Sequence, residues 1–267
     1  MSVNLFDKRA LLFLPASNPR AIAKARASRA DLVILDLEDA VKETDKDAAR
    51  ATAEEALAEP WPMAVAIRVN ALGTKWFALD VAAVARSSAD FVVAPMVESP
   101  AAVNAIRENS AKPVIAMIES AAGVLAAPAI ARDAAGLFMG VNDLAADLRL
   151  PADAGREPLR FALQSVILAA RAAKRPVFDG VFNRLDDPEG FAAECAEARR
   201  LGFDGKTLIH PSQIEPCLAA FAPTAEEIAR AERLVAAASG GAERFEGAMV
   251  ETMHVDAAKR LLERARD

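Results

Sequence analysis

The chain contains no tyrosine, only two histidines and only two cysteines among its 267 residues. It therefore cannot use phenolic acid catalysis, and two histidines are too few for a metal site built from several imidazoles. The cysteines, Cys195 and Cys217, are too few and too scattered for a disulfide framework, and we expect both to be buried structural thiols. Neither a P-loop motif nor a GxGxxG fingerprint is present, which argues against nucleoside-triphosphate and dinucleotide enzymes.

The sequence also lacks a surplus of positive charge and any long hydrophobic run. Its formal net charge is −6 at pH 7, which argues against nucleic-acid binding, although a local basic pocket could still bind a phosphorylated ligand. No apolar stretch approaches the roughly 20 residues needed to span a bilayer, and the first residues lack the apolar core of a secretory signal. We therefore expect a cytoplasmic protein that binds neither nucleic acid nor membranes.

The chain does contain a regular alternation of two kinds of segment. Eight short apolar segments have the composition of buried parallel strands: Ala10–Pro15, Leu32–Leu37, Ala64–Val69, Phe91–Val97, Pro113–Ile118, Leu137–Val141, Val177–Phe182 and Lys206–Ile209. Segments with helical periodicity follow them: Pro19–Ser28, Asp45–Ala58, Lys75–Ser87, Pro100–Asn109, Ala121–Arg132, Leu159–Ala173, Pro188–Leu201 and Pro211–Phe221. This α/β pattern predicts a (β/α)₈ TIM barrel over residues 1–222, with a doubly wound open sheet as the alternative.

Residues 223–267 form a C-terminal extension outside these eight units. Thr224-Ala-Glu-Glu227 has the capping-box pattern that begins a helix, and Ser239-Gly-Gly241 is expected to end it. A short segment ending at Glu251 and a final helix over about His254–Arg266 follow. We expect this helical extension to cover the mouth of the barrel or to reach a neighbouring subunit.

Two successive apolar runs end abruptly in an acid. They are Pro113-Val-Ile-Ala-Met-Ile-Glu119 and Gly136-Leu-Phe-Met-Gly-Val-Asn-Asp143. Because the carboxyl ends of barrel strands carry the active site, we expect Glu119 and Asp143 to converge on one divalent cation. Ligation by a few carboxylate oxygens suits Mg²⁺, which keeps several waters. The alternative is that each acid only caps the helix that follows it, or that Asn142-Asp143 marks a turn.

Arg68 follows a strongly apolar run and is a second candidate at a strand end. Its guanidinium could bind a substrate carboxylate or stabilise a developing oxyanion. Alternatively, it could form a structural ion pair with Asp36, Glu38 or Asp39, which end the second predicted strand. Strand alternation places Asp36 and Glu38 on one face, so we expect one of them to orient Arg68 or a metal-bound water.

Three other polar residues have ordinary interpretations. We expect His210, before a proline-initiated helix, to be a hydrogen-bonded core histidine, and His254, in the tail helix, to lie at the surface. Lys206 could place an amine near the barrel mouth, but we expect a solvated lysine.

Taken together, these segments resemble the citrate lyase β-subunit-like group of the HpcH/HpaI aldolase superfamily, the CoA-ester lyases. The resemblance covers most of the chain and is carried by segments in a fixed order: Arg9-Ala-Leu-Leu-Phe-Leu-Pro-Ala-Ser-Asn-Pro-Arg20, Asp36-Leu-Glu-Asp-Ala-Val41, Ile67-Arg-Val-Asn70, Met117-Ile-Glu-Ser120, Asn142-Asp-Leu-Ala-Ala-Asp147, Phe178-Asp-Gly-Val181 and Gly205-Lys-Thr-Leu-Ile-His-Pro-Ser-Gln-Ile214. Each segment alone is a weak signal, whereas the ordered set is specific.

The resemblance implies a TIM barrel that uses Mg²⁺ to cleave or form a 3-hydroxyacyl-CoA of the citramalyl-, malyl- or citryl-CoA type, with acetyl-CoA and a 2-keto acid as the other partners. It implies that Glu119 and Asp143 are the metal ligands, and that Glu119 also borders the substrate. Arg68 corresponds to the substrate-binding arginine. Glu251 lies in a stretch similar to the family's C-terminal segment, whose acid transfers a proton in a neighbouring subunit. A homo-oligomer, a trimer or hexamer, is therefore expected.

The sequence departs from the family pattern at three positions. Ala16 replaces a glycine of the opening motif, Met96 replaces a lysine that many members carry, and Glu251 replaces an aspartate. These departures keep two alternatives open. One is a metal-dependent aldolase or thioesterase acting on a related oxo-acid or acyl thioester. The other is a non-catalytic subunit of a lyase complex, for which Met96 and Glu251 would mark lost chemistry.

Overall fold

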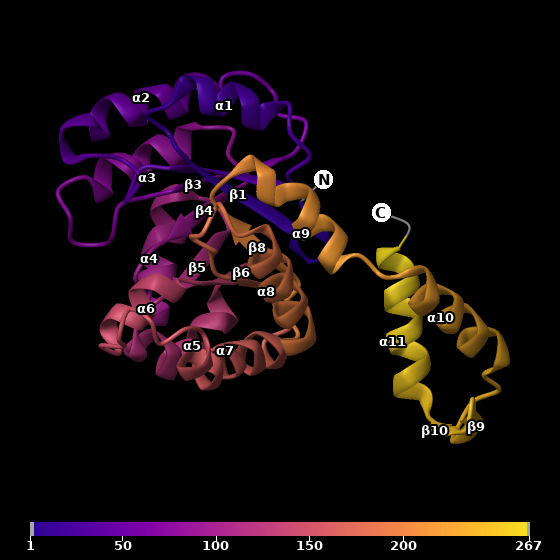
Figure 1. Ribbon diagram of the computed structural model, residues 1–267. Coiled ribbons are helices and arrows are strands. Elements are labelled where there is room, and N and C mark those ends of the chain that lie inside the picture. Colours follow the sequence, from indigo (N-terminus) through magenta and orange to yellow (C-terminus); the bar gives the residue numbers. More distant parts are fainter. Residues whose placement is uncertain (1–2, 266–267) are drawn as a thin grey trace. The chain divides into compact units, whose positions relative to one another are not determined.

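The computed structural model describes residues 3–265 and divides into two compact units, one ending at Ala220 and the other beginning at Phe221. The first unit contains eight parallel strands in sequence order: β1 (Ala10–Pro15), β2 (Leu32–Asp36), β3 (Ala64–Arg68), β4 (Phe91–Ala94), β5 (Val114–Ile118), β6 (Gly136–Met139), β7 (Val177–Asp179) and β8 (Gly205–Leu208). β1 pairs with both β2 and β8, so the sheet closes into a barrel (Figure 1). The predicted TIM barrel is confirmed, and the open sheet is wrong.

Helices surround this barrel in the first unit. Their bounds are α1 (Pro19–Arg26), α2 (Lys46–Ala56), α3 (Phe77–Arg86), α4 (Pro100–Ser110), α5 (Ala121–Asp133), α6 (Val141–Asp147), α7 (Arg160–Ala172), α8 (Pro188–Leu201) and α9 (Ile214–Phe221). Short 3₁₀ helices lie at η1 (Leu5–Asp7), η2 (Glu43–Asp45), η3 (Glu157–Leu159) and η4 (Pro211–Gln213). The sequence did not predict α6. Val141, expected to end the sixth strand, instead begins this helix, and Gly140 is the cap residue between the strand and the helix.

Apolar side chains fill the barrel interior. Phe138, from β6, makes edge-to-face contacts with Phe13 and Phe178, with ring centroids 6.1 Å and 5.5 Å apart. Leu11, Ile34 and other residues from the remaining strands complete this layer. The barrel is therefore a packed core rather than a pore, and a ligand can bind only at its mouth, where the strands end. Cys195 and Cys217 are buried free thiols, as expected.

The second unit is a helical hairpin with a small two-stranded sheet. It comprises α10 (Ala225–Ala237), β9 (Glu243–Phe245), β10 (Ala248–Val250) and α11 (Thr252–Arg264), and β9 and β10 pair antiparallel. The predicted capping box is present, because the Thr224 hydroxyl accepts a hydrogen bond from the Glu227 N–H and the Thr224 N–H donates to the Glu227 carboxylate. Within residues 3–265, no helix has the length and apolar character required to cross a bilayer.

Candidate active site

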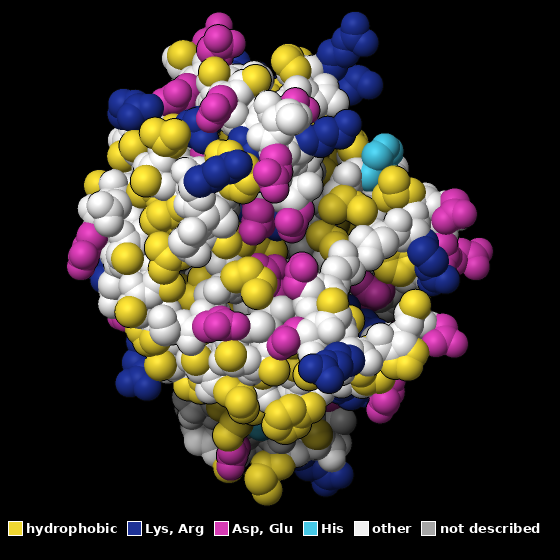
Figure 2. All heavy atoms as spheres, turned by 90° about the vertical axis from the view of Figure 1, so that its left-hand side faces the viewer, with side chains coloured by type: hydrophobic (Ala, Val, Ile, Leu, Met, Phe, Trp, Pro, Cys, Tyr) yellow, Lys and Arg dark blue, Asp and Glu magenta, His cyan; other side chains and the backbone are white. Residues whose placement is uncertain are grey.

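A cavity of about 360 Å³ opens at the carboxyl ends of the barrel strands. Its lining includes three acids, Asp36, Asp39 and Asp143, together with Arg68 and an apolar wall to which Met117, Met139 and Val141 contribute. Acidic side chains gather near the centre of the face shown in Figure 2, where the surface is hollowed. Charged side chains therefore lie at the carboxyl ends of the strands, where TIM-barrel enzymes have their active sites.

Arg68, the last residue of β3, is held by acids from the end of β2. Its Nε and one terminal nitrogen bind the two oxygens of Asp36 at 2.7 Å and 2.6 Å, a bidentate ion pair. The other terminal nitrogen lies 3.0 Å from Glu38 and 3.5 Å from Asp39. The ion pairs given as the alternative for Arg68 are present, and through them Asp36 and Glu38 orient the guanidinium as expected. These pairs raise the already high pKa of Arg68 despite its burial, so it stays cationic.

Asp36 is itself fixed by the backbone of the turn that follows β2. One of its carboxylate oxygens accepts a hydrogen bond from the Glu38 N–H at 2.9 Å, and the other accepts one from the Ala40 N–H at 3.1 Å. Asp36 and Arg68 also lie opposite each other in the register of β2 and β3. The orientation of the guanidinium is thus set by strand pairing and a tight turn together.

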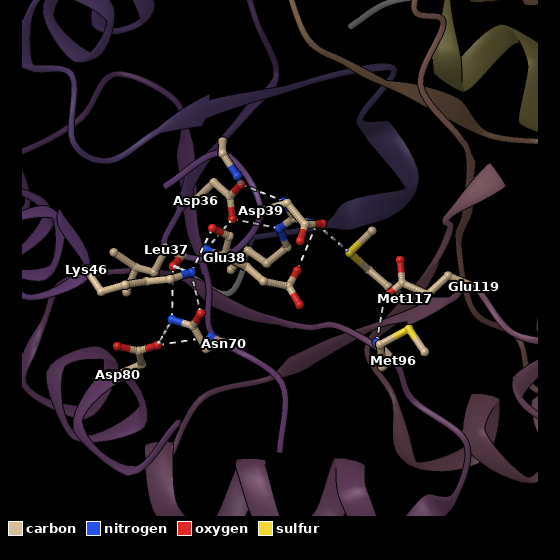
Figure 3. A network of polar contacts seen from close by, with 12 residues as sticks. Asp36, Leu37, Glu38, Asp39, Lys46, Asn70, Asp80, Met96, Met117 and Glu119 are labelled. Carbon is tan, nitrogen blue, oxygen red and sulfur yellow. Dashed lines mark hydrogen bonds and ion pairs between the residues drawn. The ribbon is translucent and has the colours of Figure 1, made fainter. Parts of the chain in front are cut away.

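Beneath that turn lies a buried lysine that sequence reasoning missed. The Lys46 ammonium donates hydrogen bonds to the Leu37 carbonyl at 2.9 Å, the Glu38 carbonyl at 2.8 Å and the Asn70 amide oxygen at 2.6 Å (Figure 3). The Asn70 side-chain nitrogen in turn donates to the Leu37 carbonyl and to Asp80. No local signal marks Lys46, which begins a charged helix. Asp80 could have been found, because it is the one acid in the otherwise apolar segment of α3.

Glu119 follows β5 directly and is almost fully buried, at 3% exposure. One carboxylate oxygen accepts a 2.6 Å hydrogen bond from the Met96 N–H. Burial raises the pKa of Glu119 to about 7; the Met96 N–H opposes this shift, and the negative charge of Asp143 adds to it. Glu119 also packs against the Cα of Gly140, where any side chain would overlap its carboxylate.

The backbone of Met96 adopts a left-handed conformation with φ of 49°, which is uncommon for a residue other than glycine. The consequence is a main-chain N–H directed at Glu119, while the Met96 side chain is largely exposed. The departure at Met96 therefore leaves intact the backbone contact that holds the buried acid.

Asp143 lies in the first turn of α6 and lines the cavity. Burial, followed by the nearby charge of Asp39, raises the pKa of its carboxyl. The capping alternative is wrong for both acids. Ser120, not Glu119, caps α5 through a 3.0 Å hydrogen bond from the Gly123 N–H, and Gly140 occupies the cap position of α6.

The donor set fits one hard divalent cation. Asp143 is close enough for its negative charge to raise the pKa of Glu119, and Arg68 is the one cation among the described residues that line the cavity. Burial also raises the pKa of Glu38 to about 8 although Arg68 lies beside it, so this carboxyl is mostly uncharged near neutral pH. No cluster of three or more His, Cys, Asp or Glu suited to a metal occurs within residues 3–265. A metal here would take two carboxylates and complete its coordination with water or substrate oxygens, as Mg²⁺ does.

Two expectations from the sequence are wrong. Lys206 is fully buried rather than solvated, and its ammonium lies 2.7 Å from Asp179 and 2.6 Å from Glu194. His210 is exposed rather than in the core, and its ring nitrogen accepts a hydrogen bond from the Ser212 N–H at 3.2 Å, which caps η4. His254 is exposed, as predicted.

Arg68 and Asp143 line the cavity at the barrel mouth, and their charges act on Glu119, which is buried and does not itself line the cavity, whereas Glu251 belongs to the second unit. Glu251 precedes α11, and its N–H donates a 3.0 Å hydrogen bond to the His254 ring. Its role in proton transfer stays a prediction.

Comparison with known proteins gives concordant matches. A protein-family model described as HpcH/HpaI aldolase/citrate lyase matches residues 9–211. Over 268 residues the chain is 39% identical to a (3S)-malyl-CoA thioesterase of Cereibacter sphaeroides, with 96% of this chain and 94% of that protein covered. It is 34% identical over 282 residues to citrate lyase subunit beta of Haemophilus influenzae, with 97% of both chains covered.

A solved structure agrees with these matches. Protein CitE of Mycobacterium tuberculosis, in complex with magnesium, acetoacetate and coenzyme A, has a TM-score of 0.87 and 37% sequence identity. The similarity covers 98% of this chain and 100% of that one, so it extends beyond the barrel to the C-terminal segment.

Proposed function

The chain belongs to the HpcH/HpaI aldolase/citrate lyase family, and from that premise we propose that it is a Mg²⁺-dependent carbon–carbon lyase. Its substrate would be a 3-hydroxyacyl-CoA of the citramalyl-, malyl- or citryl-CoA type, which it cleaves to, or forms from, acetyl-CoA and a 2-keto acid. The observation that carries this proposal is that Asp143 and a fixed guanidinium line the cavity at the barrel mouth and that both act electrostatically on the buried Glu119.

Each site residue has a separate task in this reaction. Glu119 and Asp143 would hold the Mg²⁺, which when bound supplies Lewis acidity and a template for the keto acid's oxygens. Arg68, fixed by Asp36, would bind the oxygen that becomes negative as the C–C bond breaks and acetyl-CoA enolate forms. One well-placed donor of this kind contributes about 3 kcal/mol of transition-state stabilisation. Glu251 would transfer the proton to or from the enolate carbon.

The charges around the cavity favour a keto acid with a small uncharged side group. Arg68 is the one cationic side chain in the described lining, and Asp36 already binds it through both carboxylate oxygens. A second substrate carboxylate, as in oxaloacetate, would have no cationic partner from this lining. The apolar wall that includes Met117 and Met139 suits hydrogen or a methyl group, so glyoxylate or pyruvate fits better.

An adjoining cavity of about 400 Å³ offers room for the CoA moiety. It shares Phe13 and Pro15 with the catalytic cavity and carries Arg20 and Lys24, one helical turn apart on α1. Two exposed cations beside a cavity suit the phosphates of CoA. We place the nucleotide end of the substrate here.

Thioester hydrolysis is the second candidate, favoured by the 39% identity to a protein named malyl-CoA thioesterase. The two activities release different products, because a lyase yields a keto acid and acetyl-CoA, whereas a thioesterase yields free CoA and a hydroxy acid. Incubating the purified chain with Mg²⁺ and malyl- or citramalyl-CoA, and measuring keto acid and free thiol in parallel, separates them.

The lyase proposal predicts keto acid without stoichiometric free thiol, and loss of activity in Glu119→Gln and Asp143→Asn. Glu108→Gln, at an exposed site on α4, is the matched control and should behave as the wild type. Thiol release without keto acid would support the thioesterase. If neither keto acid nor free thiol were released from these thioesters, the result would favour a non-catalytic subunit.

The proposed role of Glu251 includes a neighbouring copy of the chain, in a trimer or hexamer. Glu251→Ala and Arg68→Ala subunits should each be inactive but should regain part of the activity when mixed and allowed to exchange. Absence of recovery, with exchange verified by labelled subunits, would contradict a shared site.

A further inference from the structure

Four charged side chains outside the catalytic cavity form a buried group that the proposed reaction does not use. We call Arg156, Asp179, Glu194 and Lys206 the buried charge cluster. We propose that this cluster positions α6, and through it the metal ligand Asp143, by anchoring both ends of the segment 141–156. The inference rests on the proposed function, because it concerns the same Mg²⁺ site.

Lys206 is the centre of the cluster. Both it and Asp179 are fully buried, and they face each other in the register of β7 and β8. The Lys206 ammonium donates to Asp179 at 2.7 Å, to Glu194 at 2.6 Å and to the Gly180 carbonyl at 2.5 Å. Burial alone would lower the pKa of Lys206, but Asp179 and Glu194 raise it, so the ammonium keeps its charge.

The cluster reaches the N-terminal end of α6 through Gly180. The Gly180 carbonyl accepts a hydrogen bond from Lys206. The Cα of Gly180 packs against Val141, the first residue of α6. A β-carbon at Gly180 would lie only 2.7 Å from a methyl of Val141 and 2.8 Å from the Met139 carbonyl. Lys206 therefore fixes the surface against which the first turn of α6, including Asp143, is seated.

The same cluster reaches the other end of the segment through Arg156, which immediately precedes η3. Its guanidinium lies 2.6 Å from Asp179, 3.4 Å from Glu194 and 3.3 Å from Glu197. Asp179 thus binds Arg156 with one oxygen and Lys206 with the other. Burial would raise the pKa of Asp179, but Lys206 and Arg156 lower it, so the carboxylate stays ionised.

The segment between these anchors has little apolar packing of its own. In α6 only Leu144 is buried, and residues 151–153 are exposed. Two further ties are a hydrogen bond from the Ala121 N–H to Asp147 at 2.7 Å and the side-chain hydrogen bonds between Asn142 and Asn183, the shorter of which is 2.8 Å. A helix held by so few contacts needs fixed attachment points if one of its side chains is to coordinate a metal. Arg156 and Lys206 act in this way as positioning residues that do not touch the substrate.

The test compares Arg156→Gln with the matched control Arg171→Gln. Arg171 also binds an aspartate with both terminal nitrogens, Asp204 at 2.8 Å and 2.9 Å, but its pair does not attach to α6. Calorimetric titration of each protein with Mg²⁺ alone measures the metal affinity, and hydrogen–deuterium exchange measures the protection of residues 141–156. Neither readout depends on turnover.

Arg156→Gln should bind Mg²⁺ about 10- to 100-fold more weakly, as supporting residues of metal ligands do, and should exchange faster within 141–156. Arg171→Gln should match the wild type in both. Arg156→Lys keeps the charge but loses the planar guanidinium, so it should recover part of the Mg²⁺ affinity. The lysine variant replaces the glutamine variant in the test if the latter does not fold. An Arg156 variant with wild-type Mg²⁺ affinity, or with unchanged exchange in 141–156, would overturn the inference. Absence of Mg²⁺ binding by the wild type would refute the proposed function instead. The exchange data alone would then show whether the buried charge cluster anchors residues 141–156.

Discussion

Replacing Lys46 with methionine should destabilise the barrel more than a typical lysine substitution does. Methionine keeps most of the apolar stem but removes the ammonium that donates three hydrogen bonds. The Leu37 carbonyl would keep its bond from the Asn70 side chain, and the Glu38 carbonyl would keep its bond from the Val41 N–H. The Asn70 amide oxygen would lose its 2.6 Å bond to the ammonium.

The magnitude follows from these remaining partners. Hydrogen bonds to charged groups contribute about 1.5–3 kcal/mol each, and a buried polar atom left without a partner costs about 1–3 kcal/mol. Because two of the three acceptors keep a donor and the lysine no longer has to be desolvated, we expect a net loss of about 2–4 kcal/mol in the free energy of unfolding.

Urea unfolding followed by tryptophan fluorescence measures this loss, since the Trp76 ring lies 5.1 Å from the Lys46 ammonium. The matched control is Lys112→Met, which removes a single 3.1 Å bond to the Ser87 carbonyl and should cost less than about 1 kcal/mol. Equal losses in the two variants would refute the reasoning that Lys46 supports the turn carrying Asp36 and Glu38.

Three further predictions concern the acids and their neighbours. Protons should compete with Mg²⁺ at Glu119, whose pKa is about 7, so calorimetric Mg²⁺ affinity should rise with pH and fall by up to about tenfold per unit below about pH 7. Gly140→Ala should displace the Glu119 carboxylate and weaken Mg²⁺ binding by about 10- to 100-fold, whereas Gly136→Ala at the start of β6, whose added methyl meets no atom closer than 3.3 Å, should not. Burial raises the pKa of Glu38 to about 8 from 4.5, so its contribution to metal-free stability should be complete below about pH 4.5 and lost as the pH rises through about 8. Glu38→Gln should remove that part of the pH dependence of the urea midpoint, and an unchanged profile would contradict the assignment.

The order of strands and the acids at their ends were predictable for a single reason. A parallel strand covered on both faces must be apolar throughout, and polar residues appear where the strand reaches solvent at the barrel mouth. This pattern located Glu119 and Arg68 at the ends of β5 and β3. It misplaced the end of β6, because the apolar Val141 continues the hydrophobic run although it begins α6.

The sequence by itself determined the fold class, the position of the acidic mouth and the family resemblance, because these depend on local composition and on the order of motifs. The tertiary structure alone decided which charges are paired. Arg68 meets Asp36 across 32 residues and Lys206 meets Asp179 across 27, each pair brought together by the register of neighbouring strands. A lysine or arginine looks the same in a sequence whether water or a buried carboxylate surrounds it, and only the closing of the barrel distinguishes the two.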